Sequence, residues 1–149
     1  MLSYEGIFFE GKTADFIHSL EKQRLPIVND VIHCTFKCYP SNNEIFNELV
    51  GKEFDVLIIG YGCDGNNSGF ELRLPDSLVK YYINYDEQEP SKLKKPHITA
   101  SLTREAKPFK TKDLEFKPLD TTYSIRGRFG YWIKENNNEY VSYEKYNNK

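Results

Sequence analysis

The sequence repeats one short pattern, His-x-Thr, in Val31-Ile32-His33-Cys34-Thr35-Phe36 and in Lys95-Pro96-His97-Ile98-Thr99-Ala100. Apolar and polar residues alternate in both stretches, which predicts two β-strands. A strand projects residues i and i+2 to the same face, so each would present an imidazole and a hydroxyl side by side. The two copies use two of the three histidines in the chain.

Two such strands facing each other would place two imidazoles and two hydroxyls around one small pocket. This set suits a phosphodiester, because one histidine can take a proton from the attacking oxygen while the other gives one to the leaving oxygen. The hydroxyls can hydrogen-bond the non-bridging phosphate oxygens. An imidazole has an unperturbed pKa of about 6.5, so the sequence leaves open which histidine starts protonated. The candidate catalytic residues are therefore His33, Thr35, His97 and Thr99.

Strands and short helices alternate along the rest of the chain. We expect strands at residues 4–10, 31–38, 54–60, 69–74, 96–102, 114–118, 123–133 and 139–143. We expect helices at residues 13–24, at 75–82, and from the capping box Ser41-Asn42-Asn43-Glu44 up to Gly51. This order predicts a single α+β domain over residues 1–149. Each half carries one His-x-Thr strand, and a two-lobed arrangement with pseudo-twofold symmetry would bring the strands face to face.

The composition is that of a folded protein with no global attraction for nucleic acid. Of the 149 residues, 39% are hydrophobic and 15% aromatic, which excludes a disordered chain. The net charge of −2 argues against tight binding of duplex DNA. Basic residues nevertheless surround the second His-x-Thr, where one acid, Glu105, accompanies Lys92, Lys94, Lys95, Arg104, Lys107, Lys110 and Lys112. This stretch is equally compatible with local attraction of a phosphate and with an ordinary solvated surface.

The cysteines and the hydropathy pattern indicate a cellular compartment. Cys34, Cys38 and Cys63 form no even disulfide framework, which is typical of a reducing environment. The N-terminus shows no targeting signal, and no apolar run approaches the roughly 20 residues that cross a bilayer. We therefore expect a soluble cytoplasmic protein without a membrane partner.

Two further patterns suggest other chemistry and are not favoured. Residues 60–65 match the dinucleotide-binding pattern G-x-G-x-x-G, but an alternating strand follows them, not the helix that would hold a pyrophosphate. We expect these glycines to form a hairpin loop. Metal binding by His33 and His97 is also disfavoured, because threonine is a poor ligand and no carboxylate closely follows either histidine. His18 is expected at the solvent edge of its helix, not in the site.

The paired motifs resemble those of the two-histidine (2H) phosphoesterase superfamily, whose defining signature is a pair of His-x-Thr/Ser-x motifs. Here these are His33-Cys34-Thr35-Phe36 and His97-Ile98-Thr99-Ala100. The superfamily includes bacterial RNA 2′,3′-cyclic phosphodiesterases, cyclic phosphodiesterase domains of tRNA ligases, and phage nucleases that degrade cyclic-oligonucleotide immune signals. The stretch over residues 54–119 is most similar to small bacterial and phage members.

The resemblance implies a bilobal 2H phosphoesterase-like fold, with two antiparallel β-sheet lobes around a central cleft and helices outside. It implies hydrolysis of cyclic phosphodiesters of nucleotides without a cofactor or metal, with His33 and His97 as general base and general acid. Thr35 and Thr99 would bind the phosphate. Substrates would be RNA 2′,3′-cyclic phosphate ends or cyclic oligonucleotide second messengers, met in the cytoplasm (for a phage protein, the host's).

Recognition of the base is expected to use aromatic stacking at the mouth of the cleft, which tolerates different bases. Tyr4 and Tyr61 are the candidates for substrate binding. Arg126 and Arg128 share one face of a strand and would meet either phosphates or water. The alternative to an enzyme is a non-catalytic protein that sequesters a nucleotide or RNA in the same cleft.

Overall fold

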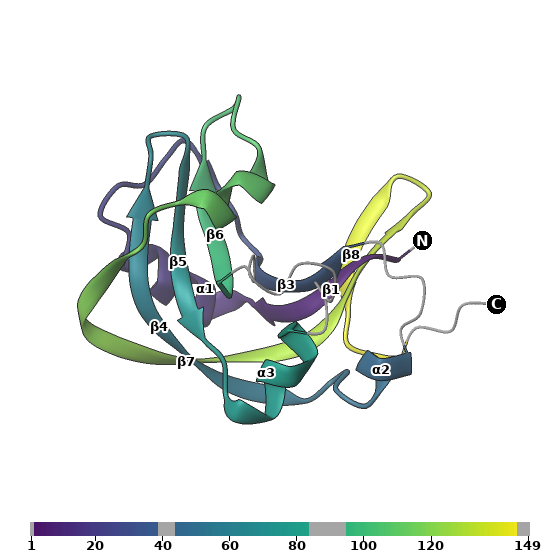
Figure 1. The fold of residues 1–149 in the computed structure, drawn as a ribbon. Helices are drawn as coiled ribbons and strands as arrows, with labels where there is room; N and C mark the ends of the chain where they lie inside the picture. Colours follow the sequence, from purple (N-terminus) through teal and green to yellow (C-terminus); the bar gives the residue numbers. More distant parts are fainter. Residues whose placement is uncertain (1, 39–43, 84–94, 146–149) are drawn as a thin grey trace.

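The computed structural model describes residues 2–38, 44–83 and 95–145 (Figure 1). Its helices are α1 (Gly11–Ser19), α2 (Glu44–Asn47) and α3 (Asp76–Ile83), together with a 3-10 helix, η2 (Pro108–Asp113). Its strands are β1 (Leu2–Phe9), β2 (Ile27–Val28), β3 (Ile32–Cys38), β4 (Glu53–Cys63), β5 (Asn67–Arg73), β6 (His97–Leu102), β7 (Lys117–Glu135) and β8 (Asn138–Ser142). No helix among these residues is long and apolar enough to cross a membrane.

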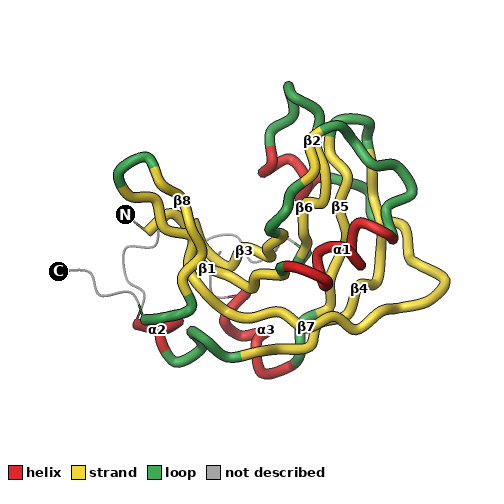
Figure 2. The backbone as a smooth tube through the Cα atoms, turned by 180° about the vertical axis from the view of Figure 1, so that it is seen from behind, coloured by secondary structure: helices red, strands yellow, loops and turns green. Residues whose placement is uncertain are grey.

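The strands form one antiparallel sheet in the order β2-β6-β5-β4-β7-β1-β3, and β8 pairs with β7. The 19-residue strand β7 joins the two parts of this sheet. Its first part pairs with β4 up to Arg128, and from Arg128 to Ile133 it pairs with β1. The sheet curves strongly, so that β3 and β6 lie next to each other although they stand near opposite ends of the strand order (Figures 1 and 2).

Most of the buried hydrophobic residues form one large core on this curved sheet, and a second, smaller cluster contains Tyr131 and Ile133. Alternate residues of β3 (Ile32, Cys34 and Phe36) and of β6 (Ile98 and Ala100) are buried in the large core. Helices α1 and α3 add Ala14, Ile17, Leu78 and Tyr81. Because side chains alternate along a strand, His33 and Thr35 of β3 and His97 and Thr99 of β6 point away from this core, and all four are partly exposed.

The α+β class and the antiparallel pairing expected from the sequence are confirmed. The strands form one continuous sheet, and the finer bilobal arrangement stays a prediction. Of the strand expected at 114–118, residues 114–116 are not in a strand, and residues 117–118 belong to the same strand, β7, as the one expected at 123–133. The helix expected over 13–24 begins at Gly11 and ends at Ser19.

Two short elements, β2 and η2, had no recognised sequence signal. Helix α2 is only four residues long, and the chain then turns to Gly51, whose φ is +84°. Most of the capping box, at residues 41–43, lies outside the described residues.

The glycine-rich stretch forms the β4–β5 hairpin, as the alternating sequence after it predicted. The Asp64 carboxylate accepts hydrogen bonds from the backbone N–H groups of Asn66 and Asn67, and Gly65 adopts a φ of +89°. No helix follows, so the turn lacks the helix N-terminus on which dinucleotide binding depends.

Candidate active site

His33 lies half-buried on β3, with its imidazole against aromatic rings. Its Nδ1 is 2.9 Å from the Thr35 Oγ1, which confirms that this His-x-Thr pair shares a face. Its ring centroid is 4.5 Å from that of Tyr4 and 5.9 Å from that of Phe8, both on β1. These rings cover one side of the imidazole and exclude water from it.

His97 is the first residue of β6, and its Nδ1 is 2.8 Å from the Lys95 carbonyl oxygen. A carbonyl oxygen only accepts hydrogen bonds, so Nδ1 carries a proton and donates it. The other ring nitrogen, Nε2, is then the one that can exchange a proton with a substrate. The backbone carbonyl thus fixes both the tautomer and the direction of the ring.

The fold brings the two His-x-Thr strands together. Strands β3 and β6 contact each other, and a backbone hydrogen bond joins the Cys34 thiol to His97. Burial of the His33 imidazole, together with the nearby charge of His97, lowers the pKa of His33 from 6.5 to about 4. At neutral pH, His33 is therefore an uncharged imidazole that can accept a proton.

The Thr99 hydroxyl lies at the end of a chain of hydrogen bonds that the sequence gave no reason to expect. Thr99 Oγ1 donates to the Thr111 Oγ1 at 2.7 Å, and the Asn67 amide donates to the same Thr111 oxygen at 3.0 Å. Thr111 belongs to η2 and is fully buried. Helix η2 therefore packs against the second motif and sets the orientation of its threonine.

Burial raises the pKa of the Cys34 thiol to about 12, so this cysteine stays protonated and acts as a core residue. Cys34 and Cys63 are free cysteines. The side chain of Cys38 lies outside the described residues. Among the residues the structure describes, no three histidine, cysteine or acidic side chains gather as a metal site.

Tyr4 is placed beside His33, where a substrate-binding residue was expected. The Tyr4 ring is also 5.8 Å from Trp132 at an interplanar angle of 2°, and 6.0 Å from Phe8. Trp132, the single tryptophan, thus extends the aromatic surface next to His33 across β1 to β7. Nothing in the sequence around Trp132 singled it out.

Tyr61 is not available for base stacking, and the expectation for this residue is corrected. Its side chain is only 7% exposed and its ring packs 5.0 Å from Phe70 in the core. Its hydroxyl hydrogen-bonds the Ser68 hydroxyl at 2.7 Å and the backbone of Gln23 at 3.1 Å. A ring enclosed in this way holds strands and loop together and offers no face to a nucleotide.

His18 is buried, contrary to the expectation that it lies at the solvent edge. It is 7% exposed, and its ring nitrogens contact the Glu21 carboxylate at 2.9 Å and the Asn29 carbonyl at 2.7 Å. Glu21, whose side chain is fully buried, also accepts hydrogen bonds from Ser68 and Ser101. This network fixes the loop after α1 to β5 and β6, so His18 is structural.

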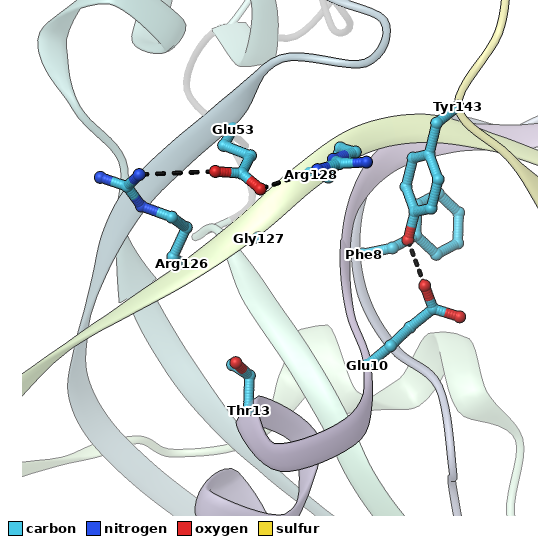
Figure 3. A pocket seen from close by; sticks show the side chains of 8 residues that line it. All are labelled: Phe8, Glu10, Thr13, Glu53, Arg126, Gly127, Arg128 and Tyr143. Carbon is cyan, nitrogen blue, oxygen red and sulfur yellow. Dashed lines mark hydrogen bonds and ion pairs between the residues drawn. The ribbon is translucent and has the colours of Figure 1, made fainter.

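The two arginines of β7 line a hollow of about 180 Å³ that also includes Phe8, Glu10, Thr13, Glu53, Gly127 and Tyr143 (Figure 3). Arg126 binds the Asp55 carboxylate through two nitrogens, at 2.9 and 3.0 Å, and Arg128 binds Glu53 at 2.8 Å. Hydrogen bonds from Arg128 and Arg126 lower the pKa values of Glu53 and Asp55 respectively. Both guanidinium groups are thus paired with carboxylates instead of meeting only water.

No protein-family model matches this sequence, and no curated protein is significantly similar to it.

Proposed function

We propose that this protein is a metal-independent phosphodiesterase that hydrolyses cyclic phosphodiesters of nucleotides. The observation that carries the proposal is the contact between β3 and β6, which joins an uncharged His33 to a His97 whose Nδ1 is fixed by a carbonyl. The geometry supports two imidazoles in one site, each accompanied by a threonine hydroxyl. This is the constellation that acid–base cleavage of a phosphodiester needs.

The pKa of His33 favours this residue as the general base. The neutral ring would take a proton from an attacking water as the new P–O bond forms. The bond from phosphorus to the ribose oxygen would then break, and protonated Nε2 of His97 would give its proton to that leaving oxygen. In each turnover His33 gains a proton and His97 loses one. Before the next turnover His33 must release its proton and His97 must take one up.

The two threonines are proposed to bind the non-bridging oxygens of the phosphate. The His33 Nδ1 lies 2.9 Å from the Thr35 Oγ1; in the tautomer in which Nδ1 donates, Thr35 keeps its own hydroxyl proton for a phosphate oxygen, and Nε2 is the nitrogen that accepts a proton. Thr99 donates to Thr111 in the structure and would turn its proton toward the bound phosphate. Both hydroxyls would then stabilise the negative charge that develops on the phosphate oxygens.

We further propose that the two parts of the sheet joined by β7 correspond to the two lobes of a 2H phosphoesterase-like fold. Strand β3 would belong to one lobe and β6 to the other, with the active-site groove between them. A cytoplasmic setting fits the two free cysteines, because disulfides are rare in reducing compartments. The nucleotide substrates named by the resemblance are found in that compartment.

The test is turnover of a 2′,3′-cyclic mononucleotide, an oligoribonucleotide ending in a 2′,3′-cyclic phosphate and a cyclic trinucleotide, each with EDTA present. We expect His33→Ala and His97→Ala each to lose about 10²–10⁴-fold in kcat, as for other general acid–base groups. Circular dichroism of each variant controls for folding. Wild-type turnover in either variant would refute the catalytic assignment, and tight binding without cleavage by the wild-type protein would identify a sequestering protein.

A further inference from the structure

The short helix η2 carries an exposed aromatic ring among basic side chains. Phe109 is 59% exposed, more than any other large hydrophobic residue that the structure describes as exposed. The Lys110 Nζ lies 5.6 Å from the centre of its ring. Lys107 and Lys112 belong to the same short segment, and we refer to Phe109 with these three lysines as the η2 ridge.

The ridge is firmly attached to the second His-x-Thr strand. Thr111 at its base is buried and accepts hydrogen bonds from Thr99 and Asn67, and the Asn67 amide also donates to the Lys107 carbonyl at 3.0 Å. A single exposed ring is ordinary on a protein surface. Phe109 differs because a lysine ammonium lies over it and because its helix is hydrogen-bonded to the threonine of the second motif, which together favour a binding role.

The positive charges of the ridge are free to meet a ligand. No ammonium group of Lys107, Lys110 or Lys112 forms an ion pair with another residue in the described part of the chain. The chain as a whole carries a net charge of −2, so this local excess of positive charge is not a general property of its surface. A phosphate backbone is the ligand that such a patch attracts.

Helix η2 places Phe109 near the second motif. Phe109 and Lys110 stand less than one helical turn from Thr111, which accepts a hydrogen bond from Thr99. A nucleotide next to a phosphate bound at Thr99 would therefore reach the ridge, where its base can stack on Phe109 and the next phosphate can meet a lysine.

We propose that the η2 ridge binds the unpaired nucleotide adjoining the scissile phosphate, so that the substrate is an oligonucleotide, linear or cyclic, instead of a cyclic mononucleotide. This inference rests on the proposed phosphodiesterase function. Figures 1 and 2 show the segment that follows β6 rising on the same side of the sheet as the β7–β8 hairpin. A strand leaving the site along η2 would therefore run beside exposed protein surface and not into the core.

A binding experiment tests the ridge without relying on turnover. The probe is a fluorescein-labelled single-stranded oligoribonucleotide with a 3′-phosphate, measured by anisotropy. Phe109→Ala is expected to weaken binding on the order of 5- to 150-fold, as for loss of one stacked base. Lys107→Gln combined with Lys110→Gln should reduce the slope of log K against log salt by about 1.4, or about 0.7 for each phosphate contact.

Two substitutions on helix α1 serve as matched controls. Phe16→Ala removes a ring that is 40% exposed on α1, and Lys12→Gln removes an exposed lysine of the same helix. Both should bind the probe like the wild-type protein. Equal binding by Phe109→Ala and wild type, or equal weakening by Phe16→Ala, would overturn the proposal.

Turnover of the same three substrates separates the sources of the oligonucleotide. We expect wild-type kcat/KM to favour the oligonucleotide substrates over the cyclic mononucleotide, and Phe109→Ala to abolish that preference through KM. The ridge fits whichever oligonucleotide, the linear 2′,3′-cyclic end or the cyclic trinucleotide, shows the larger increase in kcat/KM over the cyclic mononucleotide. Loss of probe binding in Phe109→Ala without turnover of any substrate by wild type would refute the phosphodiesterase and leave the ridge as a nucleotide-binding surface.

Discussion

His33 is expected to make the folded protein less stable in acid, and His33→Gln should remove this contribution. The pKa of His33 is about 4 in the folded protein, against 6.5 for a histidine exposed to water. Between these values the unfolded chain binds a proton that the folded protein does not, so stability rises with pH across this window. The contribution is fully present above pH 6.5 and is lost as the pH falls toward 4.

The magnitude follows from the same two values. At 1.36 kcal/mol per pH unit, the difference between 6.5 and 4 amounts to about 3.4 kcal/mol when the full window is crossed. Between pH 7.5 and 4.5 the proton-binding curves of the two states give about 2.5 kcal/mol. The free energy of unfolding of His33→Gln should therefore fall by about 2.5 kcal/mol less than that of the wild-type protein over this interval.

Urea unfolding at pH 7.5 and 4.5, followed by tryptophan fluorescence, measures the difference directly, because other ionisable groups contribute equally to both proteins. Titration of the His33 ring by NMR provides an independent value. Parallel loss of stability in the two proteins, or a His33 ring that titrates near 6.5, would show that Tyr4 and Phe8 do not exclude water from the imidazole. The argument for His33 as the general base would then lose its basis.

Three further substitutions probe the parts that support the site. Glu21→Gln replaces a fully buried carboxylate that accepts from Ser68 and Ser101, and should lower the free energy of unfolding by about 3 kcal/mol in urea titrations. Gly69→Ala would bring a Cβ to 2.4 Å from the Ile98 carbonyl oxygen, so we expect a loss of about 1–3 kcal/mol, visible as a lower melting temperature. Thr111→Val removes the acceptor for Thr99 and one acceptor for the buried Asn67 amide, so it should reduce kcat about fivefold and lower the free energy of unfolding by about 1–3 kcal/mol; full activity of the folded variant would contradict the positioning role.

The His-x-Thr strands were predictable because a strand has a strict two-residue period. Burial of Ile32, Cys34 and Phe36 follows from that period, and it places His33 and Thr35 on the other face together. The hairpin at Gly65 was predictable for a similar local reason, since an alternating strand followed the glycines. Both features could be predicted because they depend on residues that are close to each other in the sequence.

Tyr61 shows where such rules fail. Val56 and Ile58 are buried, and strict alternation from them would place Tyr61 on the opposite face. A β-bulge between Ile58 and Gly60 adds one residue, so Tyr61 turns to the core side instead. Gly60 marks a position where a bulge is plausible, but the sequence does not say whether the pairing shifts there.

The burial of His18 could have been predicted from its position in the helix. Ala14, Ile17 and His18 are spaced as one face of a helix, and all three are buried. Glu21 continues the same spacing just beyond the end of α1 and supplies the carboxylate that a buried imidazole needs. The polar character of histidine argued for the surface, and its helical position gave the better answer.

The proximity of the two motifs is a property of the whole sheet and could not be derived from the motifs themselves. Strand β3 stands at one end of the strand order and β6 is second from the other, so a flat sheet would hold them far apart. The curve depends on β7, which leaves β4 and continues along β1 near Gly127. A Cβ at Gly127 would approach Ile7 and Phe9 within 2.6 Å, so the absence of a side chain there lets β1 pack closely where the sheet turns. The catalytic pair proposed here thus depends on a glycine on another strand, which links the chemistry of His33 and His97 to the curvature of the sheet.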